Sequence, residues 1–410
     1  MNIDGERFLK DIEDLGSIGY EEGQGVTRLA LSDEDVRARE WLKDRMEEAG
    51  LDVRTDGAGN VIGRLRGSDP QGKTMVIGSH LDTVPHGGKY DGALGVLSGL
   101  ECARALAEAG IELPWDLEVI NFTDEEGHHF AGTFGSRAMM GTAAHEEIFG
   151  RKAEGALSLA DSFERLGWDT DTIGDARRDP SEFRGYLEMH VEQGGTLEQR
   201  GISAGVVTGI VGIYRYVVEV MGHANHAGTT PMNIRKDALV AAAPVFSLLP
   251  EWARARSDEM VATIGDVTVS PGAMNIIPGH CRFTVELRSL EASDMARIRD
   301  RLDTWLDDNC PDSAMKTVYE KDGVYLDDQL MQLIHEAAAK ADIEAVSMPS
   351  GAGHDAQSFA PYVPTAMIFV PSKDGISHSP DEYTSAEDLV NGVEIMMNTL
   401  LKVAEADSEG

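Results

Sequence analysis

Apolar and polar positions follow one pattern over about the first 208 residues, and a different one after them. In this first part, apolar residues three and four apart indicate helices, and short apolar runs indicate strands. The predicted helices are residues 34–49 and 94–109, each followed by a glycine, and the predicted strands are residues 60–66, 75–78 and 117–122. Strands that alternate with helices predict an α/β fold with a mixed, mostly parallel sheet flanked by helices.

The second pattern begins at about residue 209 and is typical of an α+β block with antiparallel strands. Its predicted strands are residues 214–220, 261–269 and 280–287, and its predicted helices are residues 237–249 and 294–305. Beyond residue 325, a predicted helix at 328–341 and a strand at 366–370 return to the first pattern. We therefore expect one main domain in two pieces, residues 1–208 and 326–410, with a smaller domain of residues 209–325 inserted between them.

The charge balance is strongly acidic. The 410 residues contain 36 Lys and Arg against 71 Asp and Glu, a formal net charge of -35. This balance argues against nucleic acid as a partner and against an anionic membrane surface, because both require basic residues. Acidic pairs such as Glu47-Glu48 and Asp307-Asp308 are scattered along the chain. Scattered acidity favours adaptation to high salt, where screening weakens repulsion between surface carboxylates, over a general contribution to solubility.

The three cysteines, Cys102, Cys281 and Cys310, are too few and too dispersed for a disulfide framework or a structural zinc site. The first residues carry no basic stretch followed by an apolar one, so we expect no signal peptide. No apolar run is long enough to cross a bilayer. We therefore expect a cytoplasmic protein.

Polar segments directly follow two of the predicted strands. His80 ends one strand, and Asp82 two residues later points to the same side. A carboxylate in that place can accept one imidazole N–H and leave the other nitrogen free for a metal, although a structural histidine is the alternative. Glu125 and Glu126 follow the other strand, and burying both requires a cation or a raised pKa. A solvated acidic turn is the alternative there.

Two further polar segments contain His190 and His378, and Asp91 opens a helix after a glycine-rich turn. Histidines together with carboxylates form a mixed nitrogen and oxygen ligand set. Such a set favours Zn²⁺, Mn²⁺, Co²⁺ or Ni²⁺ over the all-oxygen shell that Ca²⁺ and Mg²⁺ prefer.

The order of these segments resembles the metal-dependent amidase, hydantoinase and carbamoylase family, a branch of the dinuclear aminoacylase- and carboxypeptidase-like hydrolases. That family includes N-carbamoyl-L-amino acid hydrolases, allantoate amidohydrolases and β-ureidopropionases. The resemblance covers nearly the whole chain. It rests on the segments GSHLDTV, GGKYDGALGV, FTDEEG, EMHVEQG, GHANHAGTTPM, SGAGHDAQ and GISHSPDE.

The resemblance implies two divalent metal ions per subunit, zinc first among the candidates. One ion would be held by His80, Asp91 and His190, and the second by Asp91, Glu126 and His378, so that Asp91 bridges them. Glu125 would be the general base that takes a proton from water and passes it to the leaving nitrogen. Asp82 would orient His80.

The inserted domain resembles the family's lid and dimerisation domain, so the resemblance implies a homodimer. His226 would hydrogen-bond the oxyanion, across the dimer or on lid closure. The substrate-binding groups would be Arg288, Asn275, Arg215 and Gln193, with an arginine binding the carboxylate of a small substrate. Without that context, a surface salt bridge would be the better interpretation of either arginine.

Four histidines receive no role from the resemblance. His86 stands where relatives often carry Asn, and His129 where an Arg is common. His223 is interpreted as structural. His354, with Asp355, belongs to a segment near the site whose role is open.

The leading functional hypothesis is hydrolysis of N-carbamoyl-L-amino acids to amino acid, CO₂ and ammonia. Allantoate is the runner-up, because it also carries a ureido group beside a carboxylate. A third possibility is an N-acyl amino acid amidase or a peptidase. A non-catalytic binding protein is disfavoured, because all five ligands and Glu125 are present.

Overall fold

The computed structural model describes residues 3–69, 72–153 and 155–409. The chain divides into two compact units. Unit 1 is Met1–Thr208 together with Leu326–Gly410, and unit 2 is Gly209–Tyr325. Both pieces of unit 1 contribute strands to one sheet, which is why this unit needs two stretches of sequence.

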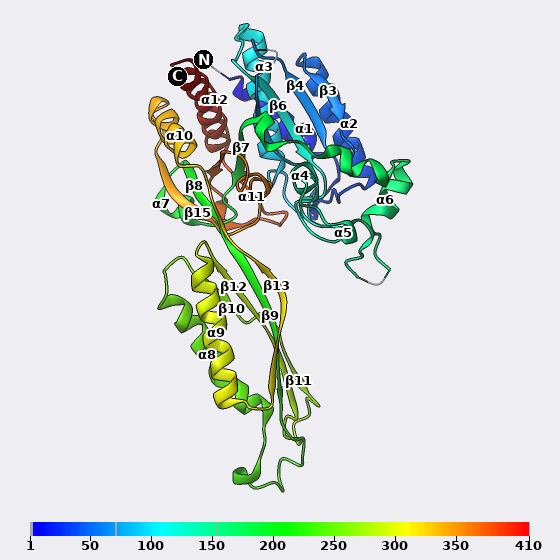
Figure 1. Ribbon diagram of the computed structural model, residues 1–410, viewed down its shortest axis with the longest axis vertical. Coiled ribbons are helices and arrows are strands. Elements are labelled where there is room, and N and C mark those ends of the chain that lie inside the picture. The colour runs from blue at the N-terminus through cyan, green and yellow to red at the C-terminus, as the bar shows by residue number, and fades with distance from the viewer. Residues whose placement is uncertain (1–2, 70–71, 154, 410) are drawn as a thin grey trace. The chain divides into compact units, whose positions relative to one another are not determined.

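The sheet of unit 1 has the strand order β8-β16-β7-β5-β6-β4-β3, and β15 also pairs with β8 (Figure 1). The strands are β3 (Asp52–Thr55), β4 (Val61–Leu65), β5 (Thr74–His80), β6 (Asp116–Phe122), β7 (Phe183–Val191), β8 (Ala204–Ile210), β15 (Ala345–Ser350) and β16 (Thr365–Val370). The four central strands, β16, β7, β5 and β6, run parallel, while β8, β4 and β3 pair antiparallel. The sheet is therefore mixed as expected, but "mostly parallel" describes its centre and not its edges.

Helices cover both faces of this sheet. Leu187 belongs to the core that β5 shares with five helices, α1, α2, α3, α10 and α12. The preceding residue of β7, Tyr186, points to the other face and stacks on Phe359 of α11, with ring centroids 4.4 Å apart. The helices of unit 1 are α1 (Gly5–Gly16), α2 (Asp33–Glu48), α3 (Ala93–Ala109), α4 (Phe134–Met139), α5 (His145–Phe149), α6 (Leu159–Leu166), α7 (Thr196–Arg200), α10 (Asp328–Lys340), α11 (Ala356–Phe359) and α12 (Ala386–Glu409).

A glycine brings α3 directly onto the central strands. A Cβ at Gly95 would lie 2.7 Å from both the carbonyl oxygen of Met189 and the Cβ of Ser79, so only glycine allows this approach. The start of α3, and the loop before it that contains Asp91, are thereby held at the ends of β5 and β7. The helix ends at Gly110 in the left-handed conformation, as the sequence predicts.

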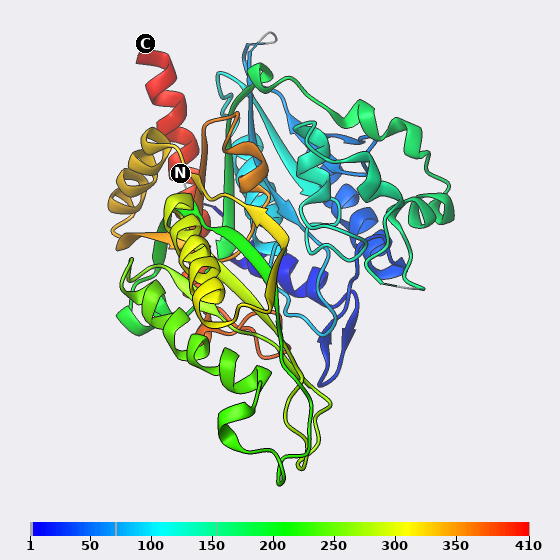
Figure 2. The ribbon, with the colours of Figure 1, turned by 60° about the horizontal axis from the view of Figure 1, so that its bottom comes forward.

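Unit 2 is an antiparallel sheet with two helices on one face. The strand order is β10-β12-β9-β13, and β11 also pairs with β12. The strands are β9 (Gly212–Met221), β10 (Val261–Thr263), β11 (Val267–Ser270), β12 (His280–Ser289) and β13 (Ser313–Lys321). The helices α8 (Ala238–Arg254) and α9 (Ala292–Asn309) contact the same side of this sheet. They lie side by side in both Figure 1 and Figure 2.

The single strand expected over residues 261–269 is wrong, because the chain forms two strands there. Gly265 and Asp266 lie between β10 and β11, and both residue types are poor strand formers. The backbone N–H of Asp266 instead bonds to the hydroxyl of Thr284.

Several short elements complete the chain. A two-stranded ribbon is formed by β1 (Tyr20–Glu21) and β2 (Gly25–Val26), and β14 (Val324–Tyr325) pairs with Gly209 and Ile210. Among the described residues, no helix combines the length and apolar character that crossing a bilayer requires. The three cysteines are free and buried.

Candidate metal centre

Acid and histidine side chains gather where the parallel strands of unit 1 end. His80 is the last residue of β5, and His190 lies one residue before the end of β7. The carboxyl ends of parallel strands share one edge of a sheet, where ligand sites of α/β proteins usually form. Loops that follow the other strands, or lead into α3, add the remaining members, Asp91, Glu125, Glu126 and His378.

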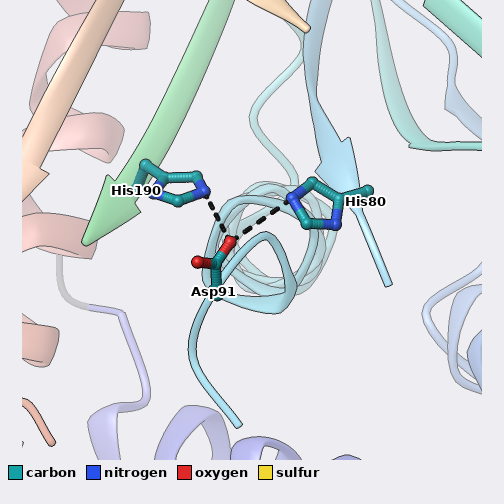
Figure 3. A group of neighbouring side chains, drawn as sticks. All are labelled: His80, Asp91 and His190. Carbon is teal, nitrogen blue, oxygen red and sulfur yellow. Dashed lines mark ion pairs between the residues drawn. The ribbon is translucent and has the colours of Figure 1, made fainter. Parts of the chain in front are cut away.

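Asp91 is the centre of the first group of side chains. Its Oδ1 lies 3.1 Å from Nε2 of His190 and 3.5 Å from Nε2 of His80. Figure 3 shows the two imidazoles on either side of this carboxylate. All three side chains are buried, and their ligand atoms lie within 4.8 Å of one another, close enough to hold a single cation.

The other oxygen of Asp91 belongs to a second group. Oδ2 of Asp91 lies 3.3 Å from Nε2 of His378, which in turn lies 3.3 Å from Oε1 of Glu126. These three residues also bring their ligand atoms within 4.8 Å. Asp91 therefore offers one carboxylate oxygen to each group, the arrangement that a shared ligand requires.

The two buried histidines present a lone pair to the site. Nδ1 of His80 donates to the carbonyl oxygen of Asp82 over 2.9 Å, and Nδ1 of His190 donates to that of Val191 over the same distance. A carbonyl oxygen can only accept, so the proton sits on Nδ1 and Nε2 is free to act as a ligand. The backbone N–H of Gly92 donates to Nε2 of His190, which agrees with this tautomer. The donor set therefore fits a divalent metal ion.

Crowding shifts the pKa values of the carboxyl groups. Burial alone would raise the pKa of Asp91, but His190, His378 and His80 outweigh burial and hold it well below its ordinary value. Burial raises the pKa of Glu125 well above its ordinary value, and the neighbouring Glu126 raises it further against the influence of His80. Burial and the charge of Asp91 raise the pKa of Glu126 to about 7. A bound cation would relieve this crowding by favouring every ionised form.

Asp82 contacts both halves of the cluster. Its carbonyl oxygen accepts from His80, while its carboxylate oxygen lies 3.9 Å from the same Nδ1. The carboxylate instead accepts the backbone N–H groups of Glu125 and Glu126, over 3.3 and 3.1 Å. Asp82 thus contacts His80 through its carbonyl oxygen rather than through its carboxylate. The sequence pattern did not predict that the carboxylate would accept the backbone N–H groups of Glu125 and Glu126.

Of the expected substrate-binding residues, Gln193 lies at this cluster. Its Nε2 is 2.7 Å from Oδ2 of Asp91 and 3.3 Å from Nε2 of His378. Its Oε1 is buried without a hydrogen-bond partner. The residue has φ 59°, a left-handed conformation that directs the side chain into the site from the end of β7.

Two arginines expected to bind substrate share one carboxylate in unit 2. Arg215 of β9 and Arg288 of β12 donate to opposite oxygens of Glu286, over 2.6 and 2.8 Å. Both guanidinium groups therefore face one small area of the sheet. The pKa of Glu286 is lowered, because these two hydrogen bonds outweigh its partial burial.

His226 and Asn275 lie together at a different place in unit 2. The carbonyl oxygen of Asn275 accepts the N–H of Ala227, and His226 forms a bridge with Ile276. Nδ1 of His226 accepts the backbone N–H groups of Gly228 and Thr229, so Nε2 carries the proton. The exposed imidazole is thus fixed as a hydrogen-bond donor.

The model of peptidase family M20/M25/M40 matches residues 76–402 of this sequence. The chain belongs to this family. The sequence is 39% identical to the N-carbamoyl-L-amino acid amidohydrolase of Geobacillus stearothermophilus, over 99% of this chain and 100% of the relative. It is 35% identical to the allantoate amidohydrolase of Bacillus subtilis strain 168, over 96% of each chain.

The M20 fold is also recognised among solved structures. A hydantoinase/carbamoylase family amidase from Burkholderia multivorans superimposes with a TM-score of 0.90 at 33% identity, over 98% of each chain. The family expected from the sequence motifs is confirmed, and so is the α/β fold with its mixed sheet. The M20 family is metal-dependent, and this chain has a fitting group of ligands.

Sequence reasoning missed two residues of this M20 site. The hydroxyl oxygen of Ser377 lies 2.8 Å from both Oδ2 of Asp91 and Oε2 of Glu382, and its single proton can be donated to either. The buried carboxylate of Glu382 also accepts the backbone N–H groups of Tyr90 and Asp91. Both residues stand in the GISHSPDE segment beside His378, so their proximity to a ligand in sequence was the available signal.

Two of the histidines without a role can now be placed. His86 is exposed, donates its backbone N–H to Thr27 and contacts the carbonyl of Gln24, so it braces the β1–β2 ribbon. His354 is buried with its ring edge-on to that of His190, at 4.5 Å between centroids. Burial lowers the pKa of His354 well below its ordinary value, so it remains neutral beside the ligand.

Proposed function

We propose that this M20 chain is a dinuclear metal-dependent amidohydrolase that cleaves the carbamoyl C–N bond of N-carbamoyl-L-amino acids. The observation that carries the proposal is Asp91, which offers one carboxylate oxygen to each of two ligand groups beside Glu125. Its support from relatives is the full-length similarity to proteins named N-carbamoyl-L-amino acid amidohydrolase, at 39%, 36% and 35% identity.

Two divalent ions would be held by the two groups, the first by His80, Asp91 and His190 and the second by Asp91, Glu126 and His378. Zinc suits this mixed set best, with manganese, cobalt and nickel as alternatives. When bound, the ions would supply Lewis acidity toward the substrate carbonyl and the attacking water.

Glu125 is the proton carrier in this proposal. Its Oε2 lies 3.5 Å from Nε2 of His80, at the edge of the cluster and within reach of a substrate held there. Glu125 takes a proton from the water that attacks the carbamoyl carbon, and it delivers that proton to the nitrogen of the amino acid as the C–N bond breaks. The amino acid leaves as the free amine, and the remaining carbamic acid decomposes to CO₂ and ammonia.

The residues of unit 2 take the binding roles. Arg288 and Arg215 bind the α-carboxylate in place of Glu286, because a guanidinium pairs well with a carboxylate. Nε2–H of His226 donates to the carbonyl oxygen as negative charge develops on it. Asn275 and Gln193 contact the polar ends of the substrate.

The homodimer is supported by the separation of these groups within one copy of unit 2. Arg288 pairs with Ile213 at one end of β12, whereas His280 pairs with Met221 at the other. Eight residues of strand span about 27 Å, and His226 follows the far end, so one copy cannot bring both groups to one small substrate. Unit 2 also has exposed apolar side chains that suit burial against a second copy, among them Met232, Ile234, Val240 and Met274.

A mixing experiment tests this sharing. We expect His226→Ala and Arg288→Met to be inactive alone, and the two proteins are unfolded and refolded together. Half of the dimers then contain one chain of each variant. If each site takes Arg288 from one chain and His226 from the other, one of the two sites in such a dimer is intact, so activity returns to about a quarter of the wild-type value. A mixture that stays inactive, while a wild-type sample refolded in the same way recovers, would place both residues of one site on one chain.

The substrate is tested with the metal-loaded protein at high salt, by release of the free amino acid from N-carbamoyl-L-amino acids and N-acyl amino acids and by release of ammonia from allantoate. N-carbamoyl-L-amino acids, allantoate and N-acyl amino acids are compared side by side by kcat/KM. The proposal expects the carbamoyl compounds to be preferred. Turnover of N-acyl amino acids alone would contradict it, as would equal activity of a Glu125→Gln variant.

Allantoate is the second candidate, and one observation favours it. The relatives named allantoate amidohydrolase, from Bacillus subtilis and Escherichia coli, are each 35% identical, close to the values for the carbamoyl enzymes. A preference for allantoate in the same comparison would keep the metal centre and Glu125 as proposed. It would change only the substrate assigned to unit 2.

A further inference from the structure

An acid, a histidine and a serine form a buried chain behind the acidic turn that contains Glu125. Nδ1 of His129 lies 2.8 Å from Oδ2 of Asp124, and its Nε2 lies 2.8 Å from Oγ of Ser162. Asp124 and His129 are 1% exposed and Ser162 is 3% exposed. The order of groups is that of a nucleophilic triad, but no substrate reaches a hydroxyl buried to this degree.

The proton positions follow from the partners. Asp124 accepts from the backbone N–H of His128 over 2.7 Å and from that of His129 over 3.3 Å, besides the imidazole. An ionised carboxylate only accepts, so Nδ1 of His129 carries a proton and Nε2 accepts the hydroxyl of Ser162. Every polar atom of the imidazole is therefore used in fixing Asp124 relative to Ser162.

The two ends of this hydrogen-bonded chain lie in different kinds of backbone. Ser162 lies in α6, which is capped by Ser158 and buries Leu159 and Phe163 in a core of unit 1. Asp124 has φ 55°, a left-handed conformation that aspartate adopts only at a cost. Contacts from outside the turn can stabilise this conformation, and α6 supplies one through Ser162 and His129.

The strained residue directly precedes the two carboxylates of the site. Glu125 lies 3.5 Å from His80, and Glu126 lies 3.3 Å from His378. Asp82 holds the turn from one side through two backbone N–H groups. His129 holds it from the other side through the side chain of Asp124.

We propose that His129 and Ser162 are positioning residues, which fix the Asp124–Gly127 turn so that Glu125 and Glu126 face the metal ligands. The inference rests on the proposed function for its effect on turnover, but not for its effect on the turn. A purely structural network would lower stability and leave the turn and the chemistry of the folded protein unchanged.

Three variants separate the contacts, and one provides a matched control. His129→Leu removes the hydrogen bonds to both Asp124 and Ser162, and Ser162→Ala removes only the hydrogen bond between Ser162 and His129. His129→Asn keeps a donor toward Asp124, because its Nδ2 takes the place of the imidazole Nδ1. Thr399→Val is the control, since the buried hydroxyl of Thr399 bonds to the carbonyl of Ile395 in α12, away from the turn.

The first readout is hydrogen exchange at the Glu125 and Glu126 amides in metal-free protein without substrate. We expect exchange to be fastest in His129→Leu, intermediate in Ser162→Ala and His129→Asn, which both keep a donor toward Asp124 but lose the contact to Ser162, and unchanged in Thr399→Val. This readout needs neither metal nor turnover, so it remains decisive if the proposed function fails. If His129→Leu does not fold, Ser162→Ala carries the test.

The second readout is steady-state kinetics. We expect kcat of His129→Leu to fall on the order of 10- to 100-fold, the usual cost of losing an outer contact of a metal site, while KM changes about twofold or less. His129→Asn and Ser162→Ala should each show part of that loss, because each keeps a donor toward Asp124 but loses the contact to Ser162. Wild-type exchange at both amides in the folded Ser162→Ala protein, or a kcat of His129→Leu equal to that of Thr399→Val, would overturn the proposal.

Discussion

The carboxylate of Asp82 accepts the backbone N–H of Glu126 over 3.1 Å, which ties the end of β5 to the turn after β6. Its other oxygen accepts from Glu125. An Asp82→Asn variant keeps one acceptor, but its NH₂ group then faces a second N–H donor. We expect kcat to fall on the order of 10- to 100-fold, as for other outer contacts of metal sites. Kinetics and bound metal are measured together, and an unchanged kcat would mean that this hold is dispensable.

Glu125→Gln separates metal binding from proton transfer. The amide preserves the shape of the side chain but cannot take a proton from water. We expect the variant to retain its metal by elemental analysis and to lose kcat on the order of 10²- to 10⁴-fold. Glu108→Gln is the control, because Glu108 is an exposed carboxylate in a surface pair with Arg7 and should keep full activity. Full turnover by Glu125→Gln would remove Glu125 from the mechanism.

Removal of metal should destabilise the fold. Without a cation, Asp91, Glu125 and Glu126 crowd their carboxyl groups into one buried place. Metal at a hundred times its dissociation constant stabilises the native state by about 2.7 kcal/mol, or roughly 2–4 °C in Tm. Calorimetry after chelation and after metal return measures the gain, and His378→Ala should reduce it. Identical Tm values in all samples would argue against a metal site.

Gly88 permits the close approach of Glu382, the residue that holds the backbone of Asp91. A Cβ at Gly88 would lie 2.2 Å from Oε1 of Glu382, although the backbone there needs no left-handed conformation. We expect Gly88→Ala to cost about 1–3 kcal/mol of unfolding free energy, in the range of other overpacked sites, and to reduce metal affinity as Asp91 shifts. Gly174→Ala is the matched control, because nothing lies within 4 Å of the position that its new methyl group would take. Denaturant titrations that do not separate the two variants would contradict the steric argument.

The acidic surface should make stability depend on salt. The net charge of -35 implies repulsion between exposed carboxylates, which dissolved ions screen. We expect Tm to rise between about 0.05 M and about 2 M KCl, since screening benefits the compact state most. A double variant, Asp307→Asn with Asp308→Asn, should show a smaller rise because both residues are exposed. A flat Tm over this range would remove the proposed adaptation to high salt.

Local pattern was sufficient for the elements that position the site. The glycine after residue 109 and the apolar run before Glu125 predicted the end of α3 and the strand β6, because both depend on neighbours in sequence. The pattern failed at residues 261–269, where apolar positions continue across Gly265 and Asp266 although the strand does not. Hydrophobic spacing alone did not weigh the poor strand propensity of those two residues.

The ligands could be named from the sequence because they stand in distinctive motifs. The contacts that hold them could not be, because they join distant segments. Ser377 and Glu382 act on Asp91 across more than half of the chain, and Asp82 reaches the acidic turn through backbone groups that carry no sequence signal. The role inferred for His129 depends likewise on Ser162, which no local motif connects to it.

The position of β16 has a consequence for how the protein is made. This strand comes from the second piece of unit 1, yet it lies between β7 and β8 in the sheet. A ribosome that adds about 5–20 residues per second leaves β7 with an unpaired edge for on the order of ten to thirty seconds after β8 is synthesised. His378 emerges later still, so the catalytic centre cannot form on the growing chain. Synthesis therefore includes an interval in which an apolar strand edge must be shielded from other chains, the task of chaperones.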